Sequence, residues 1–474
     1  MRKKTIYLTV FIMCSLCLAA CETSVANNKS MPQESKEQPK AEIQEIAENS
    51  IAQEIIEQET EEKEIAKQEE IQLELESILD KKLTIGDNRD DRAAFIEWLL
   101  DTYGIEQLEN IDFSEDIYTQ LYYVTGKSIH VLWDTSLGYL EDENTAAEHA
   151  IYLRNANDNT ADLVFAGDIC LTEEGYVIDH YDAVGGDIAL CLSEKIIDRL
   201  NEADISMINH EYPVSTRGDA LDGKYYTFRA APEREIILQQ LGIDIVSLAN
   251  NHIYDFGADA FYDTLTALKQ ADIPYVGAGA DIEEASRPVY FIAGGIKIGF
   301  VSANRSEKFI FTPEAGESSP GVVRMYDTEM MNNIIKDARE QCDYLIAYVH
   351  WGTEDSKYYE EYQTDIAQEF FSSGADAVIG SHPHVLQGIG YVGGKPVVYS
   401  LGDFWFNGET KYTAIVNLAV TIEGLVELSV LPCIQEGYET HYISDESGQE
   451  AFYDYLRELS PETVISENGI VTAK

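Results

Sequence analysis

From Asp162 onward the chain alternates short apolar segments with amphipathic ones, and this alternation limits the fold more than any other feature. The apolar segments are typical of buried strands and comprise residues 163–165, 205–208, 243–248, 298–301, 344–349, 377–379 and 397–399. Several intervening segments predict amphipathic helices, over residues 189–200, 233–241, 258–271, 329–340 and 363–371. Gly294-Gly295 and Gly393-Gly394 are typical of hairpin turns. Strands that alternate with helices, with hairpins later in the chain, predict an α/β sandwich with two sheets and outer helices.

Polar residues that suit metal binding follow five of these strands directly. They are Gly167-Asp168, Asn209-His210-Glu211, Asn250-Asn251-His252, His350-Trp351-Gly352 and Ser381-His382-Pro383-His384. Ligands of α/β sheets bind outside the carboxyl ends of the strands, so these groups are expected to meet. Pro383 restricts the backbone around it and predicts an extended turn with His382 and His384 on alternate sides. Carboxylates, an amide and imidazoles suit Mn, Fe and Zn, so the pattern predicts a metallohydrolase-type centre.

The first 21 residues are typical of a bacterial lipoprotein. Arg2, Lys3 and Lys4 precede an apolar stretch, residues 5–18, that is too short for an ordinary membrane-spanning helix. Leu18-Ala19-Ala20-Cys21 then matches a lipobox. We expect cleavage after residue 20 and lipidation of Cys21, which would hold the protein at the extracytoplasmic face of the cell membrane. An uncleaved signal anchor is the alternative.

Composition divides the rest of the chain. Residues 21–84 form an acidic Glu/Gln-rich stalk, either disordered or helical, and residues 85–158 predict a small, mostly helical module without assigned chemistry. The sandwich is expected over residues 159–440, with a C-terminal extension over 441–474. Cys170, Cys191, Cys342 and Cys433 show no CxxC spacing, which favours buried thiols.

The formal net charge of −52 limits the partners. Such a surface repels nucleic acid, which is therefore excluded as a partner, and it repels anionic lipid as well. An anionic substrate would have to be captured locally, by a metal and a few arginines.

Over residues 162–433 the chain resembles the CapA family of bacterial capsule-synthesis proteins, also described as the poly-γ-glutamate synthesis type. The resemblance rests on the order of Ala166-Gly167-Asp168, Asn209 to Pro213, Phe228-Arg229-Ala230, Leu248 to His252 with Asp255-Phe256-Gly257, Val349 to Gly352, Gly374-Ala375-Asp376, Ile379 to Gln387 and Tyr399 to Phe404. This family belongs to the calcineurin-like metallophosphoesterases. The resemblance implies a four-layer αββα sandwich that carries two metals.

The resemblance also implies roles for individual residues. Glu211 would bridge the metals, Asn251, His350 and His382 would complete one metal site, and Asp168 and His384 the other. His252 would give a proton to the leaving oxygen. Arg229 is either an anion clamp or part of a surface ion pair.

Three positions depart from the superfamily pattern. Asp168-Ile169-Cys170 stands where Asp-x-His is usual, so one metal lacks an imidazole ligand unless the Cys170 thiolate replaces it. We expect one or two divalent ions (Mn, Fe or Zn), with one held firmly and the other weakly or not at all. An ordinary buried thiol is the favoured interpretation of Cys170. Glu211 stands in place of the usual Asp. Asp403 stands where the family has Asn, as a turn cap or as an additional metal ligand.

Two hypotheses for function follow. The first is a lipid-anchored, metal-dependent hydrolase that acts in the synthesis of capsule, poly-γ-glutamate or another cell-envelope polymer. The alternative is a non-catalytic metal-containing component that assembles, exports or anchors an anionic envelope polymer. The expected partners are that polymer or its synthesis machinery, and the membrane through Cys21.

Overall fold

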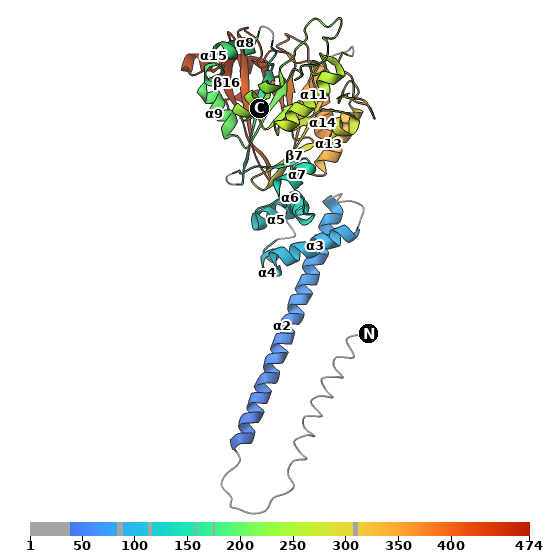
Figure 1. Cartoon of the computed structure of the whole chain (residues 1–474). Coiled ribbons are helices and arrows are strands. Elements are labelled where there is room, and N and C mark those ends of the chain that lie inside the picture. Colours follow the sequence, from blue (N-terminus) through green and yellow to red (C-terminus); the bar gives the residue numbers. More distant parts are fainter. Residues whose placement is uncertain (1–37, 83–88, 112–115, 157–158, 174–175, 307–310) are drawn as a thin grey trace, which may run out of the picture. The chain divides into compact units, whose positions relative to one another are not determined.

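The structure is a computed structural model that describes residues 38–82, 89–111, 116–156, 159–173, 176–306 and 311–474 (Figure 1). The chain divides into two compact units between Glu70 and Ile71. The predicted signal peptide, residues 1–20, and the predicted lipidation site Cys21 lie outside the described residues.

The predicted stalk is largely helical. Helix α2 (Gln38–Lys82) is 45 residues long and is rich in Glu, Gln, Lys and Ala, which are strong helix formers. Ile55, Ile56 and Ile65 are exposed along it. Among the described residues, no helix has both the length and the apolar character needed to cross a membrane.

A small helical module follows. Its helices are α3 (Arg89–Tyr103), α4 (Ile105–Leu108), α5 (Ile117–Thr125), α6 (Ile129–Ser136) and α7 (Glu143–Glu148). The end of α2 packs into this module, because Ile71 and Leu75 share a buried cluster with Phe95, Leu99 and Leu132. The module thus has an apolar core of its own.

Hydrogen bonds and one buried ion pair join the module to the sandwich. The Ser128 backbone N–H donates to the Gly295 carbonyl at 2.7 Å, and the Tyr122 hydroxyl donates to the Gly294 carbonyl at 2.5 Å. The Lys297 ammonium lies 2.6 Å from the Asp134 carboxylate, and both side chains are almost fully buried. The predicted hairpin turn at residues 294–295 is therefore also the point where the module attaches.

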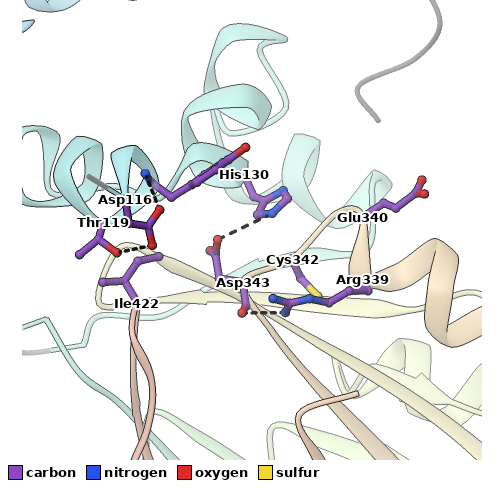
Figure 2. Close-up of a pocket in the computed structure, with 9 residues that line it drawn as sticks. Asp116, Thr119, His130, Arg339, Glu340, Cys342, Asp343 and Ile422 are labelled. Carbon is purple, nitrogen blue, oxygen red and sulfur yellow. Dashed lines mark hydrogen bonds and ion pairs between the residues drawn. The ribbon is translucent and has the colours of Figure 1, made fainter. Parts of the chain in front are cut away.

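A cavity of about 370 Å³ lies at this junction (Figure 2). Figure 2 shows the Asp343 carboxylate facing the His130 ring, with His130 Nε2 3.8 Å from Asp343 Oδ1. Burial raises the pKa of Asp343 to about 6 and lowers that of His130 to about 3. Asp343 immediately precedes strand β10 (Tyr344–His350), so His350 lies roughly 20 Å away at the other end of this extended strand.

The first sheet, sheet I, has strand order β1-β7-β8-β10-β11-β13-β12. Its other strands are β1 (Ile151–Leu153), β7 (Val289–Ala293), β8 (Ile296–Asn304), β11 (Ala377–Ser381), β12 (Ile389–Val392) and β13 (Lys395–Val398). The central strands β8, β10, β11 and β13 are parallel. Both predicted glycine pairs form hairpin turns, between β7 and β8 and between β12 and β13. The sheet includes β1, which precedes residue 159, the predicted start of the domain.

The second sheet, sheet II, has strand order β17-β16-β15-β2-β3-β4-β5. These strands are β2 (Ala161–Ile169), β3 (Ile205–His210), β4 (Ile245–Ser247), β5 (Tyr275–Val276), β15 (Lys411–Thr421), β16 (Gly424–Glu436) and β17 (Glu439–Tyr442). The short strand β14 (Asp403–Trp405) also pairs with β2, in parallel. Strands β2 to β5 are parallel, so their carboxyl ends share one edge.

Three apolar clusters separate four layers, which confirms the predicted αββα sandwich. One cluster lies between the two sheets and includes Phe165, Phe300 and Tyr348. A second packs sheet II against helices α8 (Val177–Ala183), α9 (Glu194–Glu202), α10 (Glu235–Gln240) and α11 (Gly257–Gln270). The third packs sheet I against α13 (Glu329–Arg339) and α14 (Glu361–Ser373). Figure 1 shows α13 and α14 on the side opposite α8 and α9.

The remaining elements are short, except at the C-terminus. They are the 3-10 helices η1 (Ile188–Leu190) and η2 (Pro232–Arg234), helix α12 (Ile282–Ser286), strands β6 (Ala278–Gly279) and β9 (Gly321–Val322), helix α15 (Glu446–Leu459), and strands β18 (Thr463–Ile465) and β19 (Val471–Ala473). Phe452 and Leu456 of α15 belong to the core between the sheets. The residues predicted as a C-terminal extension therefore pack as part of the sandwich.

Candidate metal centre

The candidate site lies at the carboxyl ends of strands from both sheets. In sheet II, Asp168 of β2 pairs in register with Asn209 of β3; in sheet I, His350 of β10 pairs with Ser381 of β11. Polar residues at or just after these ends therefore converge. The structure brings all six predicted metal ligands together, namely Asp168, Glu211, Asn251, His350, His382 and His384.

Asp168 and Glu211 are fully buried carboxylates held by one amide. The Asn209 Nδ2 donates to Asp168 Oδ1 at 2.8 Å and to Glu211 Oε2 at 2.9 Å. Glu211 Oε1 has no hydrogen-bond partner in the described structure, and it lies 3.6 Å from His350 Nε2. Burial raises the pKa of Asp168 to about 7 and that of Glu211 well above its usual range. A nearby cation would favour the charged forms of both groups.

The imidazoles complete the cluster. His350 Nε2 lies 2.7 Å from Asn251 Oδ1, and His350 Nδ1 lies 2.9 Å from the Ser381 hydroxyl. Burial holds the pKa of His350 and of His382 well below the usual range, so both rings are neutral and keep a lone pair for a metal. The Nδ1 of His382 is buried and has no hydrogen-bond partner among the described residues.

The His-Pro-His turn differs from the predicted extended form. His382 has φ of 100° and His384 has φ of 56°, a region that residues other than glycine rarely adopt. Both rings consequently lie near Glu211 instead of on alternate sides of the turn. Such backbone strain persists where the surrounding fold enforces it, as is common at functional sites.

These residues fit one or two divalent cations. Three groups of donors have ligand atoms within 4.8 Å of one another: Glu211 with His382 and His384, Asp168 with Glu211 and His350, and Asp168 with His384 and Asp403. The two orphaned atoms, Glu211 Oε1 and His382 Nδ1, are available for coordination. Carboxylate oxygens with imidazole nitrogens match the preferences of Mn, Fe and Zn.

Asp403 contacts the ring of the predicted ligand His384. Strand β14 places Asp403 opposite Asp168, and Asp403 Oδ1 lies 2.7 Å from His384 Nδ1. This bond leaves His384 Nε2 facing Glu211 Oε1 at 3.9 Å. Burial alone lowers the pKa of His384, but the Asp403 and Glu211 carboxylates raise it to about 10. Asp403 also accepts a hydrogen bond from Lys411, so it anchors two side chains, one of them the predicted ligand His384.

His252 lies beside the cluster in a separate hydrogen-bonded chain. Its Nδ1 is 2.7 Å from Asp255 Oδ2, and Asp255 Oδ1 is 2.6 Å from the Lys224 ammonium. The Phe228 ring packs against the imidazole, with ring centroids 4.3 Å apart. Burial lowers the pKa of His252 to about 4, although Asp255 opposes the shift. Because Asp255 accepts the proton on Nδ1, Nε2 carries the lone pair of the neutral ring.

Asn250 fixes the loop that carries Asn251 and His252. Its Nδ2 donates to Asn209 Oδ1 at 3.1 Å, and its Oδ1 accepts from the backbone N–H groups of His252 at 3.0 Å and Ile253 at 2.9 Å. One amide therefore ties the loop after β4 to strand β3.

Arg229 lies outside the cluster. Its guanidinium stacks 4.0 Å from the centroid of the Phe256 ring, and its Nη1 donates to the Gly218 carbonyl at 3.2 Å. No hydrogen bond or ion pair between the Arg229 side chain and a predicted metal ligand is present among the described residues. The Arg229 side chain is therefore held by Phe256 and backbone carbonyls, and not by a predicted ligand.

Three further polar side chains near the motifs point elsewhere. Cys170 is buried in the apolar cluster beneath sheet II, and burial raises its pKa well above the usual range. A thiol in this environment stays protonated, and Cys170 is absent from the three donor groups found among the described residues. His210 turns toward Glu235 at 3.1 Å, and the buried Trp351 donates to the Tyr399 carbonyl at 2.9 Å.

Sequence reasoning assigned no role to Asp255, Lys224, Asn209 or Asn250. Asp255 lies three residues after His252, in the motif Asp255-Phe256-Gly257, and this short spacing could have indicated that the two side chains are in contact. Lys224 is 31 residues from Asp255 in the sequence, and no local sequence pattern predicts the contact between them.

A two-sheet sandwich with carboxylates, an amide and imidazoles at the ends of its strands defines a metallophosphoesterase-like protein. The chain belongs to the family described as bacterial capsule synthesis protein PGA_cap, whose sequence profile matches residues 162–408. This match confirms the resemblance inferred from the motifs.

Two relatives and one solved structure illustrate the likeness. The capsule biosynthesis protein CapA of Bacillus anthracis is 31% identical over 251 residues, which cover 50% of this chain and 60% of that protein. The PGA biosynthesis protein CapA of Bacillus subtilis (strain 168) is 26% identical over 285 residues, which cover 59% of this chain and 73% of that protein. A 5'-nucleotidase from Candida albicans SC5314 aligns with a TM-score of 0.33 and 13% identity, over 59% of this chain and 53% of that chain.

Proposed function

We propose that the protein is a metal-dependent hydrolase of the phosphoesterase type that acts in the synthesis of capsule, poly-γ-glutamate or another anionic cell-envelope polymer. The observation that carries the hydrolase proposal is the hydrogen bond between His252 and Asp255 beside the predicted ligands. Proton transfer to a leaving group requires an imidazole oriented in this way beside the metal, whereas polymer binding does not.

The metal would be held by Asp168, Glu211, Asn251, His350, His382 and His384. A bound divalent cation supplies Lewis-acid polarisation of the scissile group and activation of water. His252 supplies proton transfer at Nε2, because Asp255 holds the other ring proton on Nδ1. An anionic substrate next to the ring raises the pKa of His252, which favours the protonated donor.

The location and the partners are part of the proposal. The lipobox Leu18-Ala19-Ala20-Cys21 supports a lipid anchor at the extracytoplasmic face of the cell membrane. The family description and the names of the relatives support an anionic envelope polymer, or its synthesis machinery, as the partner.

The test measures metal content and turnover on the same preparation. The full-length protein is purified without chelator or affinity metal, its metal content is determined by elemental analysis, and bis(p-nitrophenyl) phosphate is the substrate. His252→Gln should lower turnover by about 100- to 10,000-fold and leave the metal content unchanged. His441→Gln is the matched control, since His441 is 43% exposed and pairs with Glu439 away from the cluster.

Turnover by His252→Gln equal to that of the original protein would contradict the proposed role of this residue. A metal-loaded protein without turnover on any phosphodiester would favour the alternative, in which the metal site binds and positions a polymer. In that case His382→Ala should abolish function in cells, whereas His252→Gln should be tolerated.

A further inference from the structure

Arg305 differs from six other arginines of this acidic chain in its lack of a carboxylate partner. Six arginines lie within 3.0 Å of a carboxylate oxygen, namely Arg154, Arg199, Arg217, Arg234, Arg339 and Arg457. Arg305 has no carboxylate partner among the residues that the structure describes, and its Nε is buried without a hydrogen-bond partner. A partly buried cation without a counter-ion is unfavourable until an anion binds to it.

Arg305 is next to the candidate metal centre. It follows strand β8 directly, and its backbone N–H donates to the carbonyl of the ligand residue His350 at 2.8 Å. Its guanidinium lies 3.9 Å from the centroid of the Tyr362 ring and 5.0 Å from that of Tyr326. The two rings limit the positions that the guanidinium can adopt.

The Tyr362 ring also connects Arg305 to the His-Pro-His turn. The Tyr362 hydroxyl accepts a hydrogen bond from the Gly352 backbone N–H at 2.9 Å. Gly352 has φ of 97°, and a Cβ at this position would lie only 2.9 Å from Pro383 Cγ. Arg305 is therefore held between the two turns that carry three of the predicted imidazole ligands.

Asn304 adds a second orphaned donor at the same strand end. It pairs in register with His350 on a parallel strand, so the two side chains face the same side of sheet I. Its Oδ1 accepts from the backbone N–H of Ser306 at 2.8 Å and from the Ser306 hydroxyl at 2.6 Å, which fixes the orientation of the amide. The Asn304 Nδ2 is left buried with no partner in the described structure.

Two carboxylates around the centre, Asp403 and Asp255, are paired with other side chains. Asp403 binds His384 and Lys411, whereas Asp255 binds His252 and Lys224. The charge of Arg305 is thus available to a ligand. A guanidinium binds a carboxylate or a phosphate through two parallel hydrogen bonds, which gives orientation as well as affinity.

We propose that Asn304 and Arg305 form a subsite for a second acidic group of the substrate, separate from the group that is cleaved. The subsite selects substrates that carry repeated anionic groups, carboxylate or phosphate. This inference rests on the proposed hydrolase function, and it names the substrate class of that site.

The test compares three phosphodiesters on the metal-loaded full-length protein. Bis(p-nitrophenyl) phosphate carries no second acid, p-nitrophenyl p-carboxyphenyl phosphate carries a carboxylate, and p-nitrophenyl p-phosphonophenyl phosphate carries a phosphonate. Arg305→Met should raise KM for the preferred acid-bearing diester by about 10- to 100-fold and change kcat/KM for bis(p-nitrophenyl) phosphate less than twofold. Arg305→Lys should restore part of the loss, and Arg457→Met, on helix α15, is the matched control.

A fall of the same size for all three diesters in Arg305→Met would overturn the subsite, because it would indicate a structural role. Equal KM values of the original protein for all three diesters would overturn it as well.

The two acid-bearing diesters distinguish a carboxylate from a phosphate subsite. If the original protein cleaves none of the three, the hydrolase proposal fails, and calorimetric binding of bis(p-carboxyphenyl) phosphate tests the subsite alone. Weaker binding to Arg305→Met then supports the subsite, and equal binding overturns it.

Discussion

Replacement of Asp255 by Asn tests how His252 is oriented. The Asp255 carboxylate is fully buried and faces three donors: His252 Nδ1 at 2.7 Å, the Phe228 backbone N–H at 2.7 Å and the Lys224 ammonium at 2.6 Å. Asn has the same shape but only one acceptor oxygen. If that oxygen faces Phe228 and His252, the new NH₂ group faces the Lys224 ammonium. If the amide is turned round, the NH₂ group faces His252 and forces the ring into the other tautomer.

The expected loss follows from this geometry. In the first orientation a buried donor loses its acceptor, which costs about 1–3 kcal/mol of folding stability. In the second, Nε2 carries the proton and Nδ1 the lone pair, and turnover should fall by about 100- to 10,000-fold. Both orientations remove the negative charge that supports a protonated His252, so turnover falls in either case.

The assay measures kcat on bis(p-nitrophenyl) phosphate, with metal content and a thermal unfolding curve for each variant. Asp263→Asn is the matched control, because Asp263 accepts a hydrogen bond from Arg217 at 2.5 Å on the same side of the sandwich and does not contact His252. It should retain turnover within twofold. Asp255→Asn with full metal content and more than half of the original kcat would refute the reasoning.

Three further outcomes are expected. Asp134→Ala should lower the free energy of unfolding by about 3–5 kcal/mol in urea unfolding, because it leaves the buried Lys297 unpaired. Asp134→Leu combined with Lys297→Met should cost much less, and equal losses for the two variants would contradict this view. The apparent metal affinity should rise as pH increases from 6 to 9. Asp168, with a pKa of about 7, and His384, with a pKa of about 10, must lose protons before they can coordinate a metal. Competition with a fluorescent chelator measures this affinity. Cys170→Ala should leave the metal content by elemental analysis unchanged, and loss of one equivalent would show that this thiol is a ligand.

The layered fold could be predicted because strands and helices have different local periodicities. The strands and helices predicted between Leu163 and Tyr399 are present in the same order along the chain, and both glycine pairs form the turns expected of them. The role of the last 34 residues could not be predicted in this way, since the packing of Phe452 and Leu456 between the sheets depends on contacts distant in sequence.

That the predicted ligand residues lie close together could be predicted for a related reason. Parallel strands present their carboxyl ends at one edge, so polar residues at the ends of neighbouring strands lie close together. The conformation of the His-Pro-His turn could not, because the positive φ angles of His382 and His384 are enforced by surrounding structure.

The sequence by itself determined which chemical groups are available: carboxylates, an amide and imidazoles at strand ends, within a strongly acidic chain. Only the tertiary structure decided which charges are paired. Arg229 stacks on Phe256, whereas Arg305 stands beside His350 without a carboxylate partner in the described structure. The physical reason is that hydrophobic periodicity acts over a few residues, whereas the pairing of a side chain depends on loops and neighbouring strands that come from distant parts of the chain.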